Sequence, residues 1–181
     1  LEVTRRIRRG GNIPAVIYGD SSDLLHVAIP THELDLALRL FERPLEQHLV
    51  TVRRHYAYGR PVPIEVHKLR QILSNLIANA VHALEESGAD RSLEVSVRPR
   101  DETSIEIEIA DTGVGIAPDA LVRIFEQGFT TKARGHGIGL HYCSNTAKEM
   151  GGNLHVSSAG RGKGASFKLV LPLSGPPTVK K

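Results

Sequence analysis

The sequence predicts an α+β fold that combines amphipathic helices with antiparallel strands, and three features of the pattern indicate it. Apolar residues recur at three- and four-residue steps between His67 and Glu86, which is typical of a long helix with one buried stripe. Two later segments, 93–97 and 105–109, alternate apolar and polar residues, as strands with one buried face do. A second helical stretch at about 138–150 precedes two further strands.

The first half of this pattern has clear boundaries. Val50 and Val52 alternate with polar residues and lead to a turn at 58–61, so a strand is expected before the long helix. Gly88 is expected to end that helix. The polar segment 99–103 supplies a turn, so the two alternating segments are expected to pair as a hairpin.

The second half begins with a short helix at Pro118. The helix at about 138–150 is expected to end at the glycine pair that follows it. Closing strands are expected near 153–158 and 165–171, and the tail 174–181 is expected to be unstructured.

Composition narrows the class of protein. The chain has 181 residues, 40% hydrophobic and 24% charged, with no apolar run near the roughly 20 residues that a membrane span needs, so no membrane contact is expected. The N-terminus lacks the apolar stretch of a secretory signal, which favours a cytoplasmic location. Cys143 is the single cysteine, so an internal disulfide is excluded and a structural zinc site is not indicated.

Positive charge gathers near the N-terminus. The formal charge of the chain is +3, and Arg5, Arg6, Arg8 and Arg9 lie within five consecutive positions. Such a cluster is able to contact phosphate, including that of RNA. The simpler alternative, which four arginines alone favour, is a solvated and partly disordered N-terminus.

The long helix carries a polar ridge beside its buried stripe. Asn75 and Asn79 are four residues apart and His82 follows three later, so all three share one side of the helix. An amide oxygen is a neutral, hard ligand that suits a Mg²⁺ ion also held by nucleotide phosphates. Isolated asparagines on a helix are more often ordinary surface amides, so this ridge alone is a weak signal.

The segment from Asp111 to Ile116 places a carboxylate at a strand end, followed by Gly113 and Gly115. A carboxylate is able to accept a hydrogen bond from an exocyclic amino group, and glycine lets a flat ring approach the backbone. The alternative is a turn that begins with aspartate.

The segment from Gly135 to Leu140 opens the last helix. Its glycines let backbone N–H groups point at one place, and the helix N-terminus adds partial positive charge, which suits phosphate. It follows the stretch 125–134 rather than a strand, so a Rossmann fingerprint is disfavoured.

In order and spacing, these three segments resemble the N, G1 and G2 boxes of the ATP-binding domain shared by histidine kinases, gyrase-type topoisomerases, heat-shock chaperones and mismatch-repair proteins. IFEQGFTTK at 124–132 is similar to the kinase F box, and KEMGGNLHVSS with GKGASFKLVLPL resembles the closing strands of the kinases. The resemblance covers about 45–173. It implies an α/β two-layer sandwich (α+β) with a mixed, mostly antiparallel sheet, covered on one face by three helices, and an ATP lid.

The resemblance also implies roles for residues, with ATP and Mg²⁺ as cofactors. Asn79 would bind Mg²⁺, Asp111 would bind adenine over Gly113 and Gly115, and the glycines of the G2 box would hold the phosphates. Phenylalanines would anchor a lid whose closure excludes water. The full set expected at ATP is Asn75, Asn79, His82, Asp111, Gly113, Gly115, Ile116, Phe125, Phe129, Thr130, Thr131, Lys132, Gly135, His136, Gly137, Ile138, Gly139 and Leu140, with Asn75 and Asn79 as catalytic residues.

Asn75 bears on the reaction. ATPases of this group have a glutamate there that takes a proton from water, whereas an amide cannot act as a general base. The resemblance therefore implies phosphoryl transfer to a histidine on another domain or chain, with a response regulator as the next partner. Two alternatives stay open: an ATP hydrolase, and an RNA-binding module with a vestigial ATP fold.

Residues 4–38 resemble the N-terminal stretch of the bacterial large-subunit ribosomal protein that binds 5S ribosomal RNA, in RRIRRGGNIPAVIYG and HELDLAL. The predicted domains are therefore 1–44, a ribosomal-protein-like fragment, 45–173, the ATP-binding domain, and 174–181. The fragment is too small for a core of its own and is expected to pack on the ATP domain or stay loose. His32 and Glu33 resemble a phosphoacceptor box, but too few residues follow before Leu45 for the two-helix hairpin that carries one.

Overall fold

The computed structural model describes residues 16–17, 25–88, 90–131 and 135–175. The helices and strands follow the predicted order over the second half of the chain. In sequence they are β1 (Val16–Ile17), β2 (Leu25–Ala28), α1 (Pro30–Arg39), α2 (Glu42–Gln47), β3 (Thr51–Tyr56), β4 (Val62–Pro63), α3 (Val66–Glu85), β5 (Ser92–Pro99), β6 (Ser104–Asp111), α4 (Pro118–Arg123), α5 (Gly139–Glu149), β7 (Asn153–Ser157) and β8 (Ala165–Pro172).

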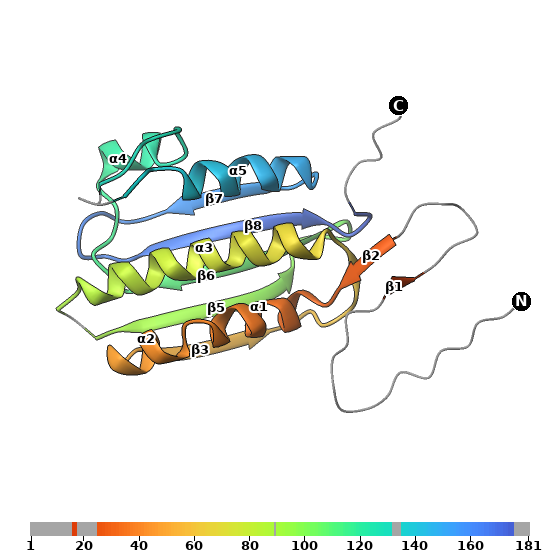
Figure 1. The fold of residues 1–181 in the computed structure, drawn as a ribbon, viewed down its shortest axis with the longest axis horizontal. Helices are drawn as coiled ribbons and strands as arrows, with labels where there is room; N and C mark the ends of the chain where they lie inside the picture. The colour runs from red at the N-terminus through yellow and green to blue at the C-terminus, as the bar shows by residue number, and fades with distance from the viewer. Residues whose placement is uncertain (1–15, 18–24, 89, 132–134, 176–181) are drawn as a thin grey trace, which may run out of the picture.

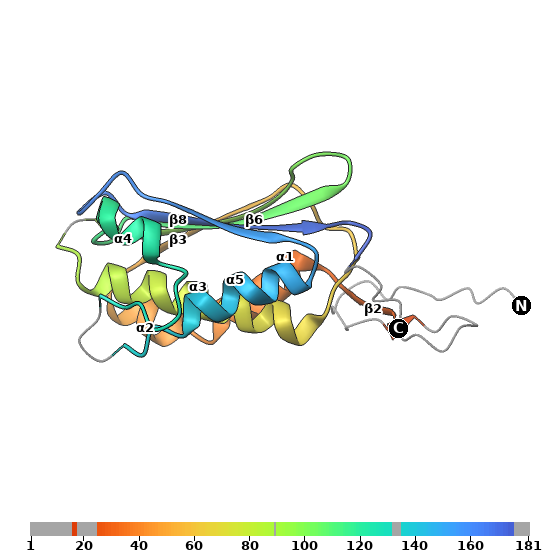
Figure 2. The same cartoon turned by 90° about the horizontal axis from the view of Figure 1, so that it is seen from above.

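The fold has two layers, a five-stranded sheet and a layer of helices. The strand order is β3-β5-β6-β8-β7, visible from bottom to top in Figure 1. Only β3 and β5 run parallel, joined through α3 as a parallel pair requires, and the other neighbours are antiparallel. Figure 2 shows the long helices α1, α3 and α5 on one side of this sheet, so the predicted α/β two-layer sandwich is confirmed. A small sheet of order β1-β2-β4 lies at one end.

The core lies between the two layers and follows from the alternation in the strands. Leu93, Val95 and Val97 of β5 are fully buried, and α3 covers them with its own apolar stripe. α5 begins at Gly139 and ends before Gly151, whose φ of 75° suits the residue that terminates a helix. The described helices include none that is long and apolar enough to cross a membrane.

The third long helix comes from the part of the chain that the sequence assigns to the ribosomal-type fragment. Leu34 and Leu38 of α1 belong to the same core as α3, and the carboxylate of buried Glu33 accepts hydrogen bonds from Arg70. On the other side of α1, Asp35 pairs with Arg54 of β3 at 3.3 Å. Of the two outcomes expected for this segment, packing on the ATP domain or staying loose, α1 shows the first, whereas the domain boundary at Leu45 stays a prediction.

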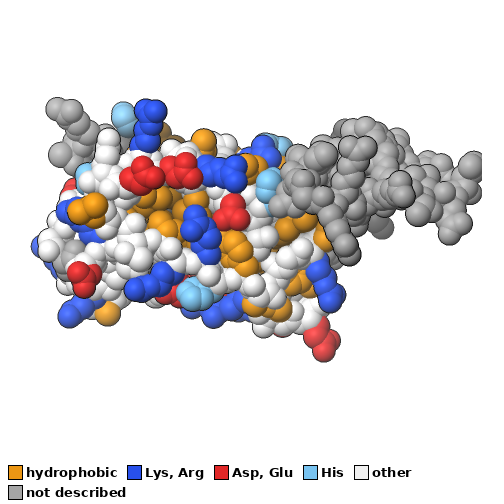
Figure 3. Space-filling model, turned by 90° about the horizontal axis from the view of Figure 1, so that it is seen from below, with side chains coloured by type: hydrophobic (Ala, Val, Ile, Leu, Met, Phe, Trp, Pro, Cys, Tyr) orange, Lys and Arg blue, Asp and Glu red, His pale blue; other side chains and the backbone are white. Residues whose placement is uncertain are grey.

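Charged and apolar side chains share the molecular edge formed by β3, α1 and α2 (Figure 3). Leu40 and Leu49, which flank α2, are 71% and 85% exposed. Leu49 also has a φ of 54°, the left-handed region that costs a branched side chain free energy.

Candidate nucleotide-binding site

The polar ridge of α3 lies at its contact with α5. Asn75 is half-buried, and its Nδ2 donates a hydrogen bond to Sγ of Cys143 at 3.5 Å, on the second turn of α5. Asn79 is also half-buried, one helical turn further along. His82 lies 3.4 Å from Glu86, the residue that caps the C-terminus of the helix, so its ring has a partner other than a nucleotide.

Asp111 ends β6 and is the buried acid of the site. Only 8% of the residue is exposed, and its Oδ1 accepts the N–H of Gly113 at 2.8 Å. Burial raises the pKa of this carboxyl to about 6, against the opposing effect of the backbone N–H groups of Gly113 and Ala165. A carboxylate has lone pairs left for further hydrogen bonds after two backbone N–H groups are bound, and such an acceptor recognises an amino group on a purine.

The loop after Asp111 is docked on α3. The N–H of Val114 donates to the carbonyl of Ala83 at 3.1 Å, and a Cβ on Gly113 would lie 2.7 Å from Cβ of Ala83. Glycine at position 113 is therefore required by close approach to the helix. Because Ala83 is one turn after Asn79, this contact brings the strand-end acid to the part of α3 that carries the two amides.

The segment expected to form the lid is joined to the glycine-rich segment. The N–H of Gly128 donates to the carbonyl of Gly137 at 3.0 Å, and Nδ1 of His141 lies 2.9 Å from the carbonyl of Phe125. The φ of Gly137 is 66°, and a Cβ there would lie 2.3 Å from the backbone of Gly128. The two segments therefore pack backbone to backbone.

The side chains of the lid segment differ in their surroundings. Phe125 packs against the core, whereas the ring of Phe129 lies 4.7 Å below the guanidinium of Arg123. Thr130 and Thr131 are exposed. Lys132, expected at the phosphates, lies outside the described residues.

The N-terminus of α5 is suited to an anion. The helix begins at Gly139 with no side-chain cap and no acid in its first turn, so no negative side chain of that turn opposes an anion at the positive end of the helix dipole. A Cβ on Gly139 would meet nothing within 4 Å. Ile138 and His136 are exposed beside it, while Leu140 packs against the core and Gly135 is partly exposed.

The oxygen ligands of this site suit a Mg²⁺ ion only if nucleotide phosphates supply further ligands. In the described ranges no group of three His, Cys, Asp or Glu side chains could hold a metal ion. The two half-buried amides of α3 supply neutral oxygens, and a Mg²⁺ ion bound by such ligands keeps waters and takes its remaining ligands from substrate phosphates.

Sequence reasoning missed the loop between β7 and β8. Ile116 donates its N–H to Oγ of Ser158 at 3.0 Å, so the loop after Asp111 is hydrogen-bonded to the β7–β8 loop. The available signal was the spacing of Gly160, Gly162 and Gly164 after a strand, which indicates a backbone that approaches another closely.

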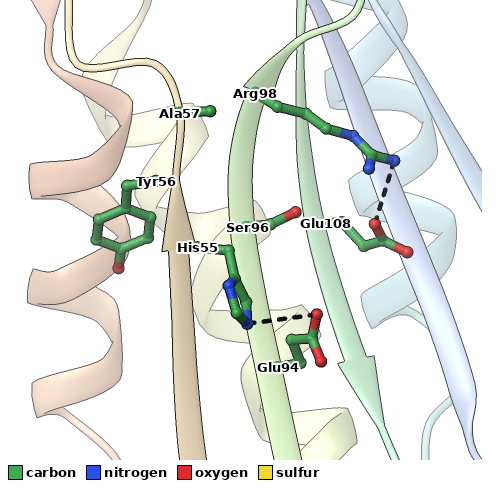
Figure 4. Close-up of a pocket in the computed structure, with 7 residues that line it drawn as sticks. All are labelled: His55, Tyr56, Ala57, Glu94, Ser96, Arg98 and Glu108. Atoms are coloured by element: carbon green, nitrogen blue, oxygen red, sulfur yellow. Dashed lines mark hydrogen bonds and ion pairs between the residues drawn. The ribbon is translucent and has the colours of Figure 1, made fainter.

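A depression of about 480 Å³ lies elsewhere, on the sheet surface formed by β3, β5 and β6. Figure 4 shows His55 beside Glu94 and Arg98 beside Glu108, at 3.6 Å and 3.4 Å. These charges pair with one another, and none of the residues expected to bind ATP lines the depression.

Residues 64–175 match the family described as histidine kinase-, DNA gyrase B-, and HSP90-like ATPase, and residues 2–70 match the ribosomal L25p family. The sensor histidine kinase ZraS of Escherichia coli (strain K12) is 33% identical over an alignment of 168 positions, which covers 84% of this chain and 34% of that protein. The two-component sensor PprA of Pseudomonas aeruginosa is 38% identical over 146 residues, covering 77% and 16%. The chain thus spans about a third or less of these relatives.

Solved structures share the fold. The catalytic domain of histidine kinase ThkA superposes with a TM-score of 0.71 at 21% identity, covering 81% of this chain and 96% of that one. The mycobacterial sensor histidine kinase MprB gives 0.70 at 24% identity, covering 84% and 99%.

The layered fold, the buried acid at a strand end and the glycine-containing loop docked on α3 are the features of a nucleotide-binding domain. The family model extends over more than half of the sequence. The chain therefore belongs to the histidine kinase-, DNA gyrase B- and HSP90-like ATPases, and its sequence relatives are sensor histidine kinases.

Proposed function

We propose that this chain binds Mg-ATP and donates the γ-phosphoryl group to a histidine carried by another domain or chain. The observation that carries the proposal is the position of Asp111, buried at the end of β6 and tied to the turn of α3 that follows Asn79. Asp111 would accept a hydrogen bond from the amino group of adenine, and Asn79 would hold the metal, with Asn75 one helical turn before it. The N–H groups at the start of α5 would meet the phosphates.

Asn75 favours transfer to histidine over hydrolysis. Attack by water on the γ-phosphate is assisted when a side chain takes up the proton, and an amide has no basic site for it. A neutral histidine is already a nucleophile, so transfer needs mainly positioning and charge neutralisation. Mg²⁺ would neutralise phosphate charge, and the lid segment 125–131 would close over the triphosphate and exclude water.

The decisive experiment is a titration of the chain with a fluorescent ATP analogue with and without Mg²⁺. Asn79→Ala is expected to remove most of the Mg²⁺-dependent gain, and Asp111→Asn is expected to weaken binding in both conditions. His55→Gln, which changes a residue of the remote depression, is the matched control. Equal affinities in all four proteins would contradict the proposal.

In the parent system, the partners would be a histidine-bearing dimerisation domain and a response regulator, as in a two-component pathway, and the location would be cytoplasmic. Incubation with radiolabelled ATP and a separately supplied histidine domain tests the transfer. Release of phosphate without that acceptor would instead favour an ATP hydrolase.

The match of residues 2–70 to a ribosomal protein family favours RNA as a second partner. Arg5, Arg6, Arg8 and Arg9, which lie outside the described residues, would supply phosphate contacts. Such binding would weaken steeply with salt, so a titration with 5S-type RNA at 50 and 200 mM salt tests it. An absence of binding at the lower salt would remove this function.

A further inference from the structure

The loop between β7 and β8 is a second glycine-rich loop that lies along the loop after Asp111. The N–H of Gly162 donates to the carbonyl of Val114 at 2.6 Å, and that of Gly164 donates to the carbonyl of Gly113 at 3.1 Å. The β7–β8 loop thus satisfies backbone carbonyls of residues 113 and 114, and the loop after Asp111 has a second support besides α3.

Two of the contacts are too close for any side chain. The φ of Gly115 is 67°, and a Cβ there would lie 2.1 Å from the carbonyl oxygen of Gly160. A Cβ on Gly164 would lie 1.9 Å from the carbonyl oxygen of Asp111. Because glycines form this contact, almost no side chain is available to fix the two loops relative to each other.

Ser158 supplies that side chain. Its Oγ accepts the N–H of Ile116 at 3.0 Å and the N–H of Gly160 at 3.3 Å, and donates to the carbonyl of Gly164 at 2.6 Å. One donor and two acceptor positions are the full capacity of a hydroxyl group, so every one is used. The bond from Ile116 joins Ser158 to the loop after Asp111. The bonds with Gly160 and Gly164 hold the β7–β8 loop around the same oxygen.

We infer that Ser158 is a positioning residue for the nucleotide, which holds residues 111–116 in the conformation that receives the purine. This inference rests on the proposed binding of ATP and extends it. Ser158 acts through the N–H of Ile116, which without the hydroxyl would be a half-buried donor with no support.

The test compares Ser158→Ala with Ser157→Ala in the full chain. Ser157, the preceding residue on β7, is exposed and serves as a matched control. Ser158→Ala is expected to raise the Kd for ATP and for ADP by the same factor, about tenfold, and to speed hydrogen exchange at the N–H of Ile116. Ser157→Ala is expected to change neither quantity.

If Ser158→Ala raised the Kd for ATP and the Kd for ADP by different factors, the inference would be overturned. The loop after Asp111 is expected to contact the adenine, which both nucleotides contain. An unchanged Kd in Ser158→Ala would do the same, even with faster exchange. If that variant does not fold, Ser158→Cys keeps the shape with weaker hydrogen bonds and should bind a few-fold more weakly than wild type; wild-type affinity there would also overturn it. Failure of the wild type to bind either nucleotide would instead refute the proposed function.

Discussion

Asp111→Asn is expected to make the folded chain more stable while it weakens ATP binding. Burial raises the pKa of Asp111 from 3.8 to about 6, so the charged form is less favourable in the folded chain than in the unfolded chain. This penalty is absent well below pH 4, grows as pH rises from 4 to 6 and is complete above pH 6. A difference of about 2 pKa units corresponds to about 3 kcal/mol at neutral pH.

An asparagine at position 111 carries no charge but still accepts the N–H of Gly113 through its amide oxygen. The free energy of unfolding at pH 7.5 should therefore rise by about 1–3 kcal/mol, since part of the gain is lost to burial of the amide. From the same two pKa values, the electrostatic part of the gain falls from about 3 kcal/mol at pH 7.5 to about 1 kcal/mol at pH 4.5, so the net gain should be about 2 kcal/mol smaller at the lower pH.

Urea unfolding at these two pH values measures the difference, and Glu102→Gln, in the exposed turn after β5, is the control. The affinity for ATP at pH 7.5 should fall about tenfold or more, because a charged acceptor has been replaced by a neutral amide. If Asp111→Asn destabilised the fold equally at both pH values, the carboxylate would not carry the burial penalty and the reasoning would be refuted.

Four further changes have defined outcomes. Leu49→Asn should raise the free energy of unfolding by about 1 kcal/mol in urea, because asparagine tolerates the φ of 54° better than leucine, and an unchanged midpoint would argue against strain there. Cys143→Val removes the acceptor for the amide of Asn75, so the affinity for Mg-ATP should fall several-fold with little change in the affinity for ATP without Mg²⁺; equal losses in both would exclude a role at the metal. Asn75→Glu supplies a base, so phosphate release without an acceptor should rise above the wild-type rate, measured in a coupled assay. Arg70→Met leaves the buried carboxylate of Glu33 without its cation and should cost about 2 kcal/mol in urea, less than for a fully buried pair because Arg70 is partly exposed; no loss would show that the ion pair does not stabilise the packing of α1.

Much of the fold follows from local patterns. α3 was expected at 67–86 and spans Val66–Glu85, and the hairpin of β5 and β6 pairs as predicted, because period and burial coincide in these segments. The segment that forms α1 was expected to pack on the ATP domain or to stay loose. Ten residues within a stretch that resembles another protein family do not reveal which surface buries them. The parallel pairing of β3 with β5 is a long-range choice that alternation within β3 does not encode.

The site was predictable only where side-chain chemistry stands at an element boundary. Asp111 at the end of β6 and Gly139 at the start of α5 are of this kind, and both lie where the sequence pattern placed them. The contact made by Ser158 was not predictable, because it joins Ser158 to Ile116, 42 residues earlier, and only the tertiary fold brings the two loops together. Asn75 is an intermediate case. The sequence predicted on which side of α3 it lies, but not its hydrogen bond to Cys143 of α5.

The ion pair between α1 and α3 also gives the N-terminal part of the chain a mechanical link to the amides. Arg70 is five residues before Asn75, about one and a half turns of an uninterrupted helix, and a helix transmits a push along its axis with little compression. The same ion pair thus sets how α1 lies against the stretch of α3 that leads to Asn75 and Asn79.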